Sequence, residues 1–247
     1  MKIALLADLH ANLGAVRACL AHAESQGAEE YAFLGDLVGY GPEPAEVVEI
    51  VAEHAARGAV VVRGNHDAAV AEGRTDTMDK AAAAAVDWTR DHLGEAGRRF
   101  LAQLPLTVRR DGALFVHATA DDPESWTYVT DALRAGQSIA AAGASWTFGG
   151  HVHVPALYYA SAGGRAVHFN PVPGVRIPVA PRRKWLAVVG SAGQPRDGNP
   201  AACYALADLA DAALTFFRVP YDVTGAAARL RASGLPPRLA VRLERGR

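Results

Sequence analysis

The sequence predicts an α/β protein whose first half builds a parallel sheet and whose second half adds mixed strands. Apolar runs alternate with helical patterns over the first 67 residues, and this β-α-β-α-β order implies parallel strands joined by right-handed crossovers. After residue 153, short apolar runs are separated by turn residues instead. The chain has 247 residues, which fits a single domain over 1–247 with a sizeable core.

Each element of the first half has a local reason in the sequence. The apolar runs 3–7, 31–34 and 59–62 have the length of buried strands. Asn12 is placed to cap a helix whose apolar residues recur at helical spacing, and Gly27 ends that helix. A Gly/Pro-rich loop over 39–42 leads into a second helix over about 44–57.

Residues 68–105 change in character and are predicted to form a helical insertion between core strands. Helices are expected over 78–93 and 95–104. A strand over 114–116, a polar surface loop over 119–131 with Trp126 and Tyr128, a helix near 131–142 and a strand over 146–148 follow.

The second half is predicted to be mainly strands, and the chain to end in a tail. Strands are expected over 157–160, 165–169, 185–189, 202–206 and 214–218, with turns at 163–164, 198–199 and 208–211. A last helix is expected over 223–232, and the Arg-rich residues 238–247 are expected to fray.

Composition limits the classes of function. The formal net charge is −1 and half of the residues are apolar, so neither general nucleic-acid binding nor a membrane partner is expected. No apolar stretch reaches the roughly 20 residues that span a bilayer, and no signal peptide is visible. Cys19 and Cys203 have no paired-thiol spacing, which predicts a reduced, cytoplasmic setting. Phosphate-loop, dinucleotide-turn and nucleophile-elbow motifs are absent from the sequence.

Five short polar motifs carry the chemistry, and each follows a predicted strand. They are Asp8-Leu9-His10, Gly35-Asp36, Gly64-Asn65-His66-Asp67, His117 and Gly150-His151-Val152-His153. Ligands of open α/β sheets bind beyond the carboxyl ends of the strands, so these motifs are expected to converge at one edge. Carboxylate, amide and imidazole donors without a thiolate suit two borderline divalent ions, Mn, Fe, Zn, Ni or Co, that share one carboxylate.

Taken singly, the motifs have plain structural interpretations. An isolated Asp-x-His or Gly-Asp is more often a loop start or a turn, and an isolated His117 is more often a hydrogen-bonded strand end. The metal interpretation therefore rests on the ordered set. His22, His54 and His92 lie in helical stretches and are predicted to be surface residues, and His168 is predicted not to be a ligand.

The ordered motifs resemble the signature of the calcineurin-like metallophosphoesterase superfamily. The stretches 39–42 and 190–198 also resemble its compact prokaryotic members. This resemblance implies a four-layer α/β/β/α sandwich with two central mixed sheets. It further implies one metal at Asp8, His10, Asp36 and His153, and a second at Asp36, Asn65, His117 and His151. Asn65 would also position the phosphate group. His66 would lie beside the leaving group without binding a metal, and Asn12 would support the first loop.

The second motif departs from the protein-phosphatase branch, where it continues Gly-Asp-x-x-Asp-Arg-Gly. Here Gly39 replaces the aspartate that orients the catalytic histidine, and Tyr40 replaces a phosphate-clamping arginine. A Ser/Thr protein phosphatase is therefore not expected. Tyr40 and Arg196 become candidate substrate residues, with Arg63 a second candidate cation. Asp67 is the nearest candidate to orient His66.

The resemblance implies a hydrolase of small phosphomonoesters or phosphodiesters. A hydroxide bridging the two metals would attack phosphorus in line, and His66 would be the general acid. The alternative is a catalytically silent, metal-binding interaction scaffold of the same fold, which should lack the free histidine or several ligands. The chain keeps all of these residues. Which ester is the natural substrate, and the oligomeric state, stay open.

Overall fold

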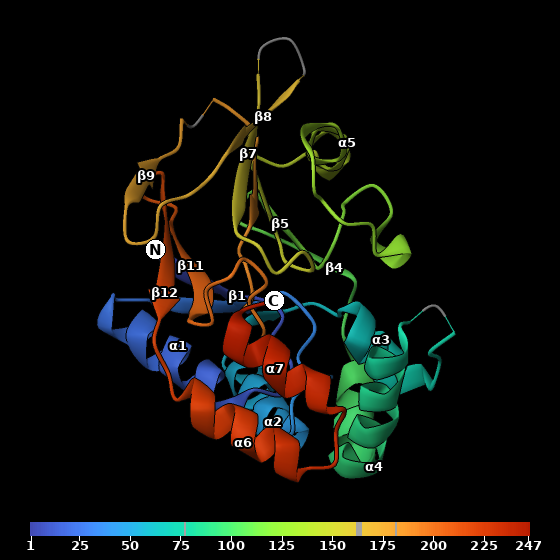
Figure 1. Ribbon diagram of the computed structural model, residues 1–247. Coiled ribbons are helices and arrows are strands. Elements are labelled where there is room, and N and C mark those ends of the chain that lie inside the picture. Colours follow the sequence, from blue (N-terminus) through green and yellow to red (C-terminus); the bar gives the residue numbers. More distant parts are fainter. Residues whose placement is uncertain (77, 162–164, 181) are drawn as a thin grey trace.

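Two six-stranded sheets pack face to face in the computed structural model, which describes residues 1–76, 78–161, 165–180 and 182–247 (Figure 1). The first sheet has the order β3-β2-β1-β11-β12-β9. Its strands are β1 (Lys2–Leu6), β2 (Glu30–Phe33), β3 (Val60–Val61), β9 (Arg176–Pro178), β11 (Ala202–Asp208) and β12 (Ala213–Val219). As predicted, β1, β2 and β3 are parallel, and β11 adds antiparallel to β1.

The second sheet has the order β4-β5-β6-β10-β7-β8. Its strands are β4 (Thr107–Arg110), β5 (Ala113–Val116), β6 (Trp146–Gly149), β7 (Ala156–Ala160), β8 (Ala166–Phe169) and β10 (Trp185–Val188). The central strands β5, β6 and β10 are parallel, and β4, β7 and β8 are antiparallel to their neighbours. Both sheets are therefore mixed.

Side-chain alternation along the central strands creates the layers. In β1, Ile3 and Leu5 point into the core between the sheets, whereas Ala4 and Leu6 point to the opposite face. In β10, Trp185 and Ala187 face the other sheet, whereas Leu186 packs with the residues of α5. Each central strand is thus buried on both faces, which explains its continuous apolar sequence.

Helices cover the outer face of each sheet (Figure 1). The α-helices of the described residues are α1 (Leu13–Ser25), α2 (Pro44–Ala56), α3 (Asn65–Glu72), α4 (Lys80–Gln103), α5 (Ala132–Ala142), α6 (Val223–Ala232) and α7 (Pro237–Arg245). Residues of α1, α2 and α4 pack on the first sheet, and α5 packs on the second. This arrangement confirms the predicted four-layer α/β/β/α sandwich.

The predicted helices 78–93 and 95–104 form one kinked element. Gly94 interrupts α4 with a φ of +72°, a value outside the helical range. The side chain of Asn12 caps α1 as expected, because it accepts a hydrogen bond from the Ala15 amide at 3.3 Å. That residues 68–105 are an insertion stays a prediction. The predicted turn at 163–164 lies outside the described residues.

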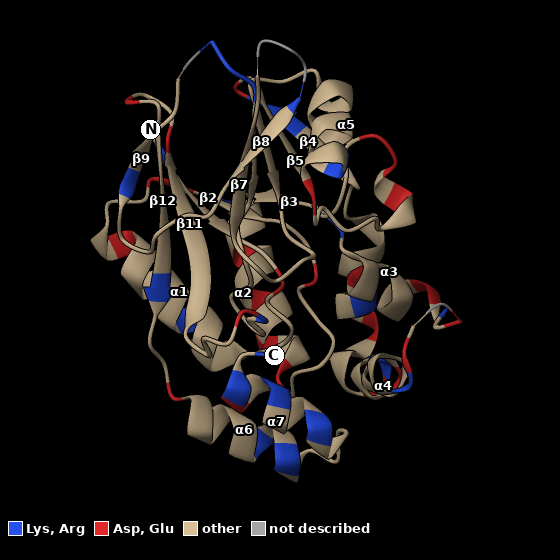
Figure 2. Ribbon diagram, turned by 45° about the horizontal axis from the view of Figure 1, so that its top comes forward, with Lys and Arg blue, Asp and Glu red and all other residues tan. Residues whose placement is uncertain are grey.

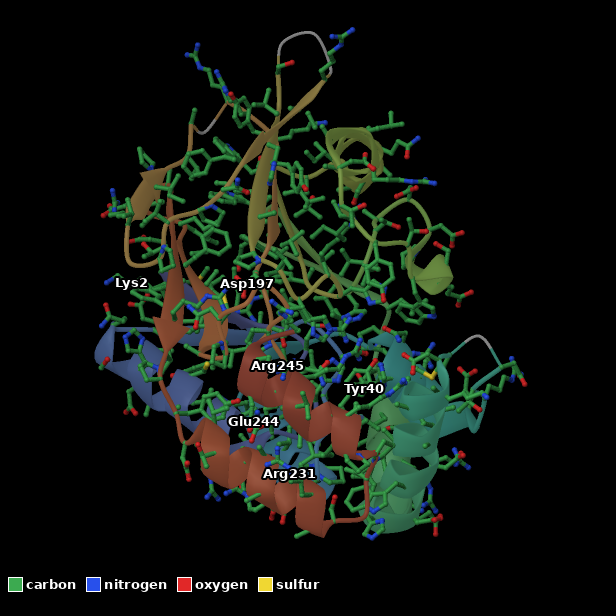
Figure 3. The ribbon with its side chains drawn as sticks, in the orientation of Figure 1. Lys2, Tyr40, Asp197, Arg231, Glu244 and Arg245 are labelled. Atoms are coloured by element: carbon green, nitrogen blue, oxygen red, sulfur yellow. The ribbon has the colours of Figure 1, made fainter. Side chains whose placement is uncertain are left out.

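The end of the chain corrects the sequence prediction. Residues 238–247 were expected to fray, but α7 is a helix whose Leu239, Ala240 and Leu243 are buried. They join a small core with residues of α4 and α6 and with the Tyr40 ring, and Figure 3 shows Tyr40 beside this helix. Arg231 and Glu244 link α6 to α7 at 2.7 Å. Of the arginines that suggested a tail, Arg238 and Arg245 lie on the exposed face of this amphipathic helix, and Figure 2 marks its basic residues.

Two edge strands were missed because they are short and only half apolar. Both β4 and β9 alternate between half-buried and exposed residues and lie at the edge of a sheet. Two histidines predicted for the surface are half-buried. The Nδ1 of His22 lies 2.8 Å from the Tyr204 hydroxyl, and the His54 ring packs 4.7 Å from that of Tyr31. Over the described residues, no helix is long and apolar enough to cross a membrane.

Candidate metal centre

The five polar motifs converge where β1, β2, β3, β5 and β6 end. Backbone hydrogen bonds join the loops: the Asp8 amide donates to the Gly35 carbonyl at 3.0 Å, and the Gly150 amide donates to the His117 carbonyl at 2.9 Å. Each of these side chains is buried except Asn65, which is half-buried at the start of α3. Parallel strand order thus brings together residues 145 positions apart, from Asp8 to His153.

Five of these residues have left-handed backbone conformations. The φ values are +52° at Asp8, +45° at His10, +53° at Asp36, +67° at His151 and +63° at His153. A side chain in this region costs about 1–3 kcal/mol and persists only where surrounding structure holds it. The cross-loop hydrogen bonds provide that support. The strained backbone therefore occurs at the residues whose polar side chains turn toward one another.

Gly64 has a packing reason of its own. A Cβ at this position would overlap the Asp36 carboxylate and lie 2.9 Å from its Cγ. The absent side chain lets Asp36 Oδ1 accept a hydrogen bond from the His66 amide at 2.8 Å. The Gly64 turn therefore docks the second motif against the third.

The side chains form two donor clusters that share Asp36. The first cluster contains Asp8, His10, Asp36 and His153, and the second contains Asp36, His117 and His151. Within each, the possible ligand atoms lie within 4.8 Å of one another. The Asn65 amide oxygen extends the second cluster, 3.2 Å from His117 Nε2. The structure therefore brings together all seven of the predicted metal-site side chains.

Backbone carbonyls set the tautomer of all four clustered histidines. His10 Nδ1 donates to Val38 O at 3.1 Å, His117 Nδ1 to Leu34 O at 2.7 Å, His153 Nδ1 to Gln194 O at 2.6 Å and His151 Nε2 to Trp126 O at 2.8 Å. A carbonyl only accepts, so the proton of each neutral ring is on the outer nitrogen. The inner nitrogens carry lone pairs, as metal-binding imidazoles do.

These lone pairs face each other at short range. The two Nε2 atoms of His10 and His153 are 3.1 Å apart, and His117 Nε2 is 3.1 Å from His151 Nδ1. Two neutral rings with this tautomer cannot hydrogen-bond to each other, and where His117 carries a second proton its Nε2 donates to His151 Nδ1, so that this proton takes the place of the metal cation. A cation between them would remove the repulsion, so the donor set fits a metal ion at each position.

The shared carboxylate adds negative charge to both clusters. Asp36 Oδ2 lies 3.7 Å from His10 Nε2 and 3.5 Å from His117 Nε2. Burial opposes its charge, but His117 and the other imidazoles hold the Asp36 pKa well below its usual value. Burial likewise disfavours a charged His117, yet the carboxylates of Asp36 and Asp8 raise its pKa to about 9. The electrostatics favour a cation at His117 Nε2.

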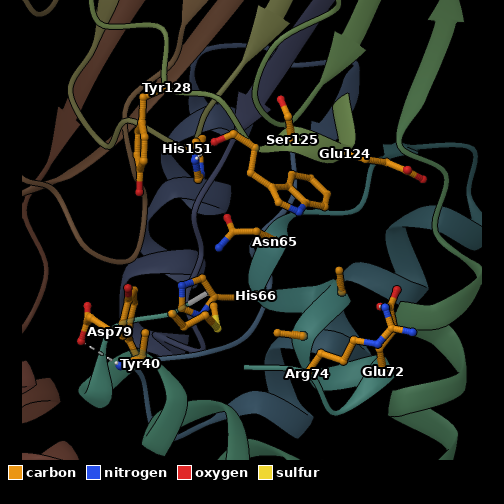
Figure 4. A pocket seen from close by; sticks show the side chains of 15 residues that line it. Tyr40, Asn65, His66, Glu72, Arg74, Asp79, Glu124, Ser125, Tyr128 and His151 are labelled. Atoms are coloured by element: carbon orange, nitrogen blue, oxygen red, sulfur yellow. Dashed lines mark hydrogen bonds and ion pairs between the residues drawn. The ribbon is translucent and has the colours of Figure 1, made fainter. Parts of the chain in front are cut away.

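His66 lies outside both clusters and lines a cavity of about 530 Å³ beside them (Figure 4). Burial lowers its pKa to about 4, against the raising effect of Asp36. Its ring packs on Tyr40, with centroids 4.4 Å apart. Its buried Nδ1 has no hydrogen-bond partner among the described residues and is enclosed against Gly39. Nε2 is therefore the nitrogen left to contact a substrate.

Asp67 does not orient His66, contrary to the sequence prediction. Its carboxylate accepts hydrogen bonds from the amides of Leu37 and Gly64, both at 2.9 Å, and of Val38 at 3.3 Å. Asp67 thereby holds the second motif in place. His66 is positioned by packing, because Gly39 and Tyr40 contact its ring.

The candidate substrate residues occupy different places. Tyr40 is nearly buried, at 6% exposure, and lines the cavity. Arg196 is half-buried, with its guanidinium 5.7 Å from the centre of the Tyr40 ring and 3.1 Å from Gln194 Oε1. Arg63 pairs with Glu72 at 3.7 Å. His168 is exposed and stacks on Tyr158 in the second sheet, outside both donor clusters.

Sequence reasoning missed the groups that support the ligands. Four carbonyls orient the histidines, and Asn12 Nδ2 donates to Gly193 O at 2.8 Å, which links the first motif to the 190–198 stretch. Carbonyls have no side-chain signature. Trp126 did carry a signal, since a tryptophan in a polar loop is unusual, and its loop lies over His151.

Comparison with known proteins identifies the family. Residues 1–212 match the family described as the calcineurin-like phosphoesterase superfamily domain, and the chain belongs to it. It is 32% identical over 255 residues to an uncharacterized protein of Methanocaldococcus jannaschii, covering 99% of this chain and 98% of that one.

Solved structures agree with this assignment. A metallophosphoesterase from Sphaerobacter thermophilus is 34% identical, with a TM-score of 0.89 and coverage of 100% of this chain and 99% of that one. A hypothetical protein from Pyrococcus horikoshii OT3 is 21% identical, with a TM-score of 0.81 and coverage of 100% and 98%. The second likeness concerns the fold alone.

Proposed function

We propose that this chain is a two-metal phosphoesterase that hydrolyses a small phosphomonoester or phosphodiester. The observation that carries the proposal is the pair of donor clusters sharing Asp36, with four imidazole lone pairs directed inward. Family membership supports hydrolysis of a phosphate ester as the reaction class. The cavity beside the clusters provides room for a substrate.

Asp8, His10, Asp36 and His153 would hold one ion, and Asp36, Asn65, His117 and His151 the other. Carboxylate, amide and imidazole donors suit Mn, Fe, Zn, Ni or Co. Bound divalent ions of this kind lower the pKa of a coordinated water and neutralise charge on phosphoryl oxygens.

The chain's own residues would position the ester and handle the proton. The Asn65 side chain lines both the cavity and the second donor cluster, so it can hold a phosphoryl group against that cluster. His66 is neutral in the free protein near pH 7, since its pKa is about 4. Negative charge on a bound phosphoryl group would raise that pKa, as Asp36 already does, and would let Nε2 protonate the leaving oxygen.

The scaffold alternative predicts lost ligands, and none of the seven is missing. A cytoplasmic location stays a prediction that rests on Cys19 and Cys203, two buried free thiols.

The test is metal reconstitution with Mn²⁺, followed by metal analysis and hydrolysis of p-nitrophenyl phosphate and bis-p-nitrophenyl phosphate. We expect two equivalents of metal and turnover of at least one ester. The variant His117→Asn should lose metal and activity, whereas His168→Asn, an exposed histidine outside the clusters, should keep both. Two bound equivalents of metal without turnover of either ester would favour the metal-binding scaffold over the phosphoesterase. Protein that binds no metal would overturn both the phosphoesterase and the metal-binding scaffold.

A further inference from the structure

The cavity beside His66 has two unlike walls. One wall comes from α3, the start of α4 and Met78 between them, and its apolar residues are Ala68, Ala69, Met78 and Ala82. The other comes from the loop predicted as a polar surface loop, and it carries Trp126 and Tyr128. At about 530 Å³, the cavity lies within the range of pockets that enclose a small organic ligand, about 300–1,000 Å³. A phosphoryl group alone would leave most of it empty.

Contacts with the metal-site histidines hold both aromatic rings in place. The Tyr128 ring stacks on His151 with centroids 4.0 Å apart, and the Trp126 ring meets His117 edge-on at 6.0 Å. The Trp126 carbonyl also accepts a hydrogen bond from His151 Nε2. The backbone of Trp126 is in the left-handed region, with a φ of +53°. Tyr128 is nevertheless 48% exposed. Because these rings are already fixed in the folded protein and keep exposed area, a planar group can stack on them without a further loss of side-chain entropy.

The charges around the cavity disfavour a second phosphate. Glu72, Asp79 and Glu124 line it, and Arg74 is the one cation among the described residues that do so. Arg74 is 79% exposed and lies 3.9 Å from the Glu72 carboxylate. Figure 4 shows Glu72 and Arg74 on the same side of the cavity. Asp79 pairs with Arg238 and Glu72 with Arg74, and Glu124 has no ion pair among the described residues, so a second anionic group would meet more carboxylate than cation on the lining.

We propose that this cavity binds a planar aromatic group of the phosphate ester, of nucleoside size and without further phosphate, and that Trp126 and Tyr128 determine the preference. The reaction part of this assignment rests on the proposed phosphoesterase function, whereas binding does not. Stacking on a protein aromatic ring is worth about 1–3 kcal/mol per base, which corresponds to about 5–150-fold in affinity.

The test compares esters that differ only in the aromatic group. Adenosine 5′-monophosphate is paired with ribose 5-phosphate, and the methyl ester of adenosine 5′-monophosphate with the methyl ester of ribose 5-phosphate, so that the members of each pair differ in the base alone. We expect the Mn²⁺-loaded protein to favour the base-containing member at least about tenfold in kcat/KM. Adenosine 3′,5′-bisphosphate should be a poorer substrate than the monophosphate. In the double variant Trp126→Ala/Tyr128→Ala the preference should fall to within about threefold.

Phe169→Ala is the matched control, because Phe169 is an aromatic residue of similar exposure, 45%, outside the cavity. It should leave the preference unchanged. Equal turnover of both members by the parent protein, or a preference that survives the double variant, would overturn the assignment and leave the phosphoesterase function standing.

Calorimetric binding of adenosine 5′-monophosphate and ribose 5-phosphate separates the two proposals. Base-dependent binding without turnover of any ester would support the cavity assignment and overturn hydrolysis. Protein that shows neither binding nor turnover would overturn both.

Discussion

Replacing Gly39 with alanine tests how the fold positions His66. Gly39 has a φ of +85°, and a Cβ there would overlap His66 Nδ1 and lie 3.0 Å from Cγ of the ring. Gly58 is a matched control because its φ is +94° and a Cβ there meets no atom within 4 Å. Both substitutions introduce left-handed strain, but only Gly39→Ala introduces a clash with a buried ring.

The two effects have different magnitudes. Left-handed strain costs about 1–2 kcal/mol, which is the expected loss of stability for Gly58→Ala. Overpacking of a filled core typically adds about 1–3 kcal/mol, so Gly39→Ala should lose about 2–5 kcal/mol in total. A displaced His66 ring would press on Tyr40 or His10, which pack against it at 4.4 and 5.0 Å between centroids, or would move into the cavity that it lines, and either movement would shift Nε2. Hydrolysis by Gly39→Ala should therefore fall although every metal ligand is present.

The measurement is urea unfolding of the metal-free proteins, so that altered metal affinity does not enter the comparison. In a His66→Ala background the ring is gone and only the Cβ of residue 66, 3.2 Å away, remains close. The cost of Gly39→Ala should then approach that of Gly58→Ala. Equal costs for both glycines in the parent, or an undiminished cost in the His66→Ala background, would refute the packing account.

Four further expectations follow from the same structure. Asp36→Asn should lose at least one metal equivalent and nearly all turnover, because this carboxylate belongs to both clusters, and two full equivalents with normal rates would contradict the bridge. Metal binding near pH 7 should release about one proton from His117, whose pKa is about 9, so affinity should weaken about tenfold per pH unit as pH falls below 9. Mn²⁺ calorimetry in buffers of different ionisation enthalpy counts that proton, and a value of zero would exclude a charged ring. His66→Asn should keep both metals and slow alkyl esters more than nitrophenyl esters, within the roughly 10²–10⁴-fold of a general acid. Equal losses on both esters would leave His66 a binding group. Leu239→Ala should destabilise by about 2–5 kcal/mol in thermal or urea unfolding, whereas Val241→Ala, at an exposed position of the same helix, should change little. Similar small effects for both would indicate a frayed end.

Sequence alone predicted the elements that local chemistry specifies. The strands leading to Asp8, Asp36 and Asn65 are short apolar runs, and the polar residues after them fall at the carboxyl ends of parallel strands, where they must meet. Asn12 predicted the start of a helix, and the helical patterns over 78–93 and 95–104 meet where the structure has its kink, at Gly94. These features follow from propensity and periodicity, which act over a few neighbouring residues.

Other features depended on contacts between distant segments, which no local pattern encodes. The C-terminal arginines predicted a frayed tail, yet Leu239 and Leu243 bury themselves against α4 and Tyr40. Asp67, next to His66 in sequence, turns away to three backbone amides. Gly39 takes the place of the aspartate of the protein-phosphatase branch, and the His66 ring packs against it.

The division is clearest for the histidines of the metal centre. Their identity and order were readable, because imidazoles after successive strands form a pattern along the chain. Which nitrogen carries the lone pair was not, because carbonyls such as Trp126 O, 25 residues before His151, decide it across the fold. Side-chain type is a property of the sequence, whereas the direction of a donor atom depends on hydrogen bonds that form only when the sheets and loops have packed.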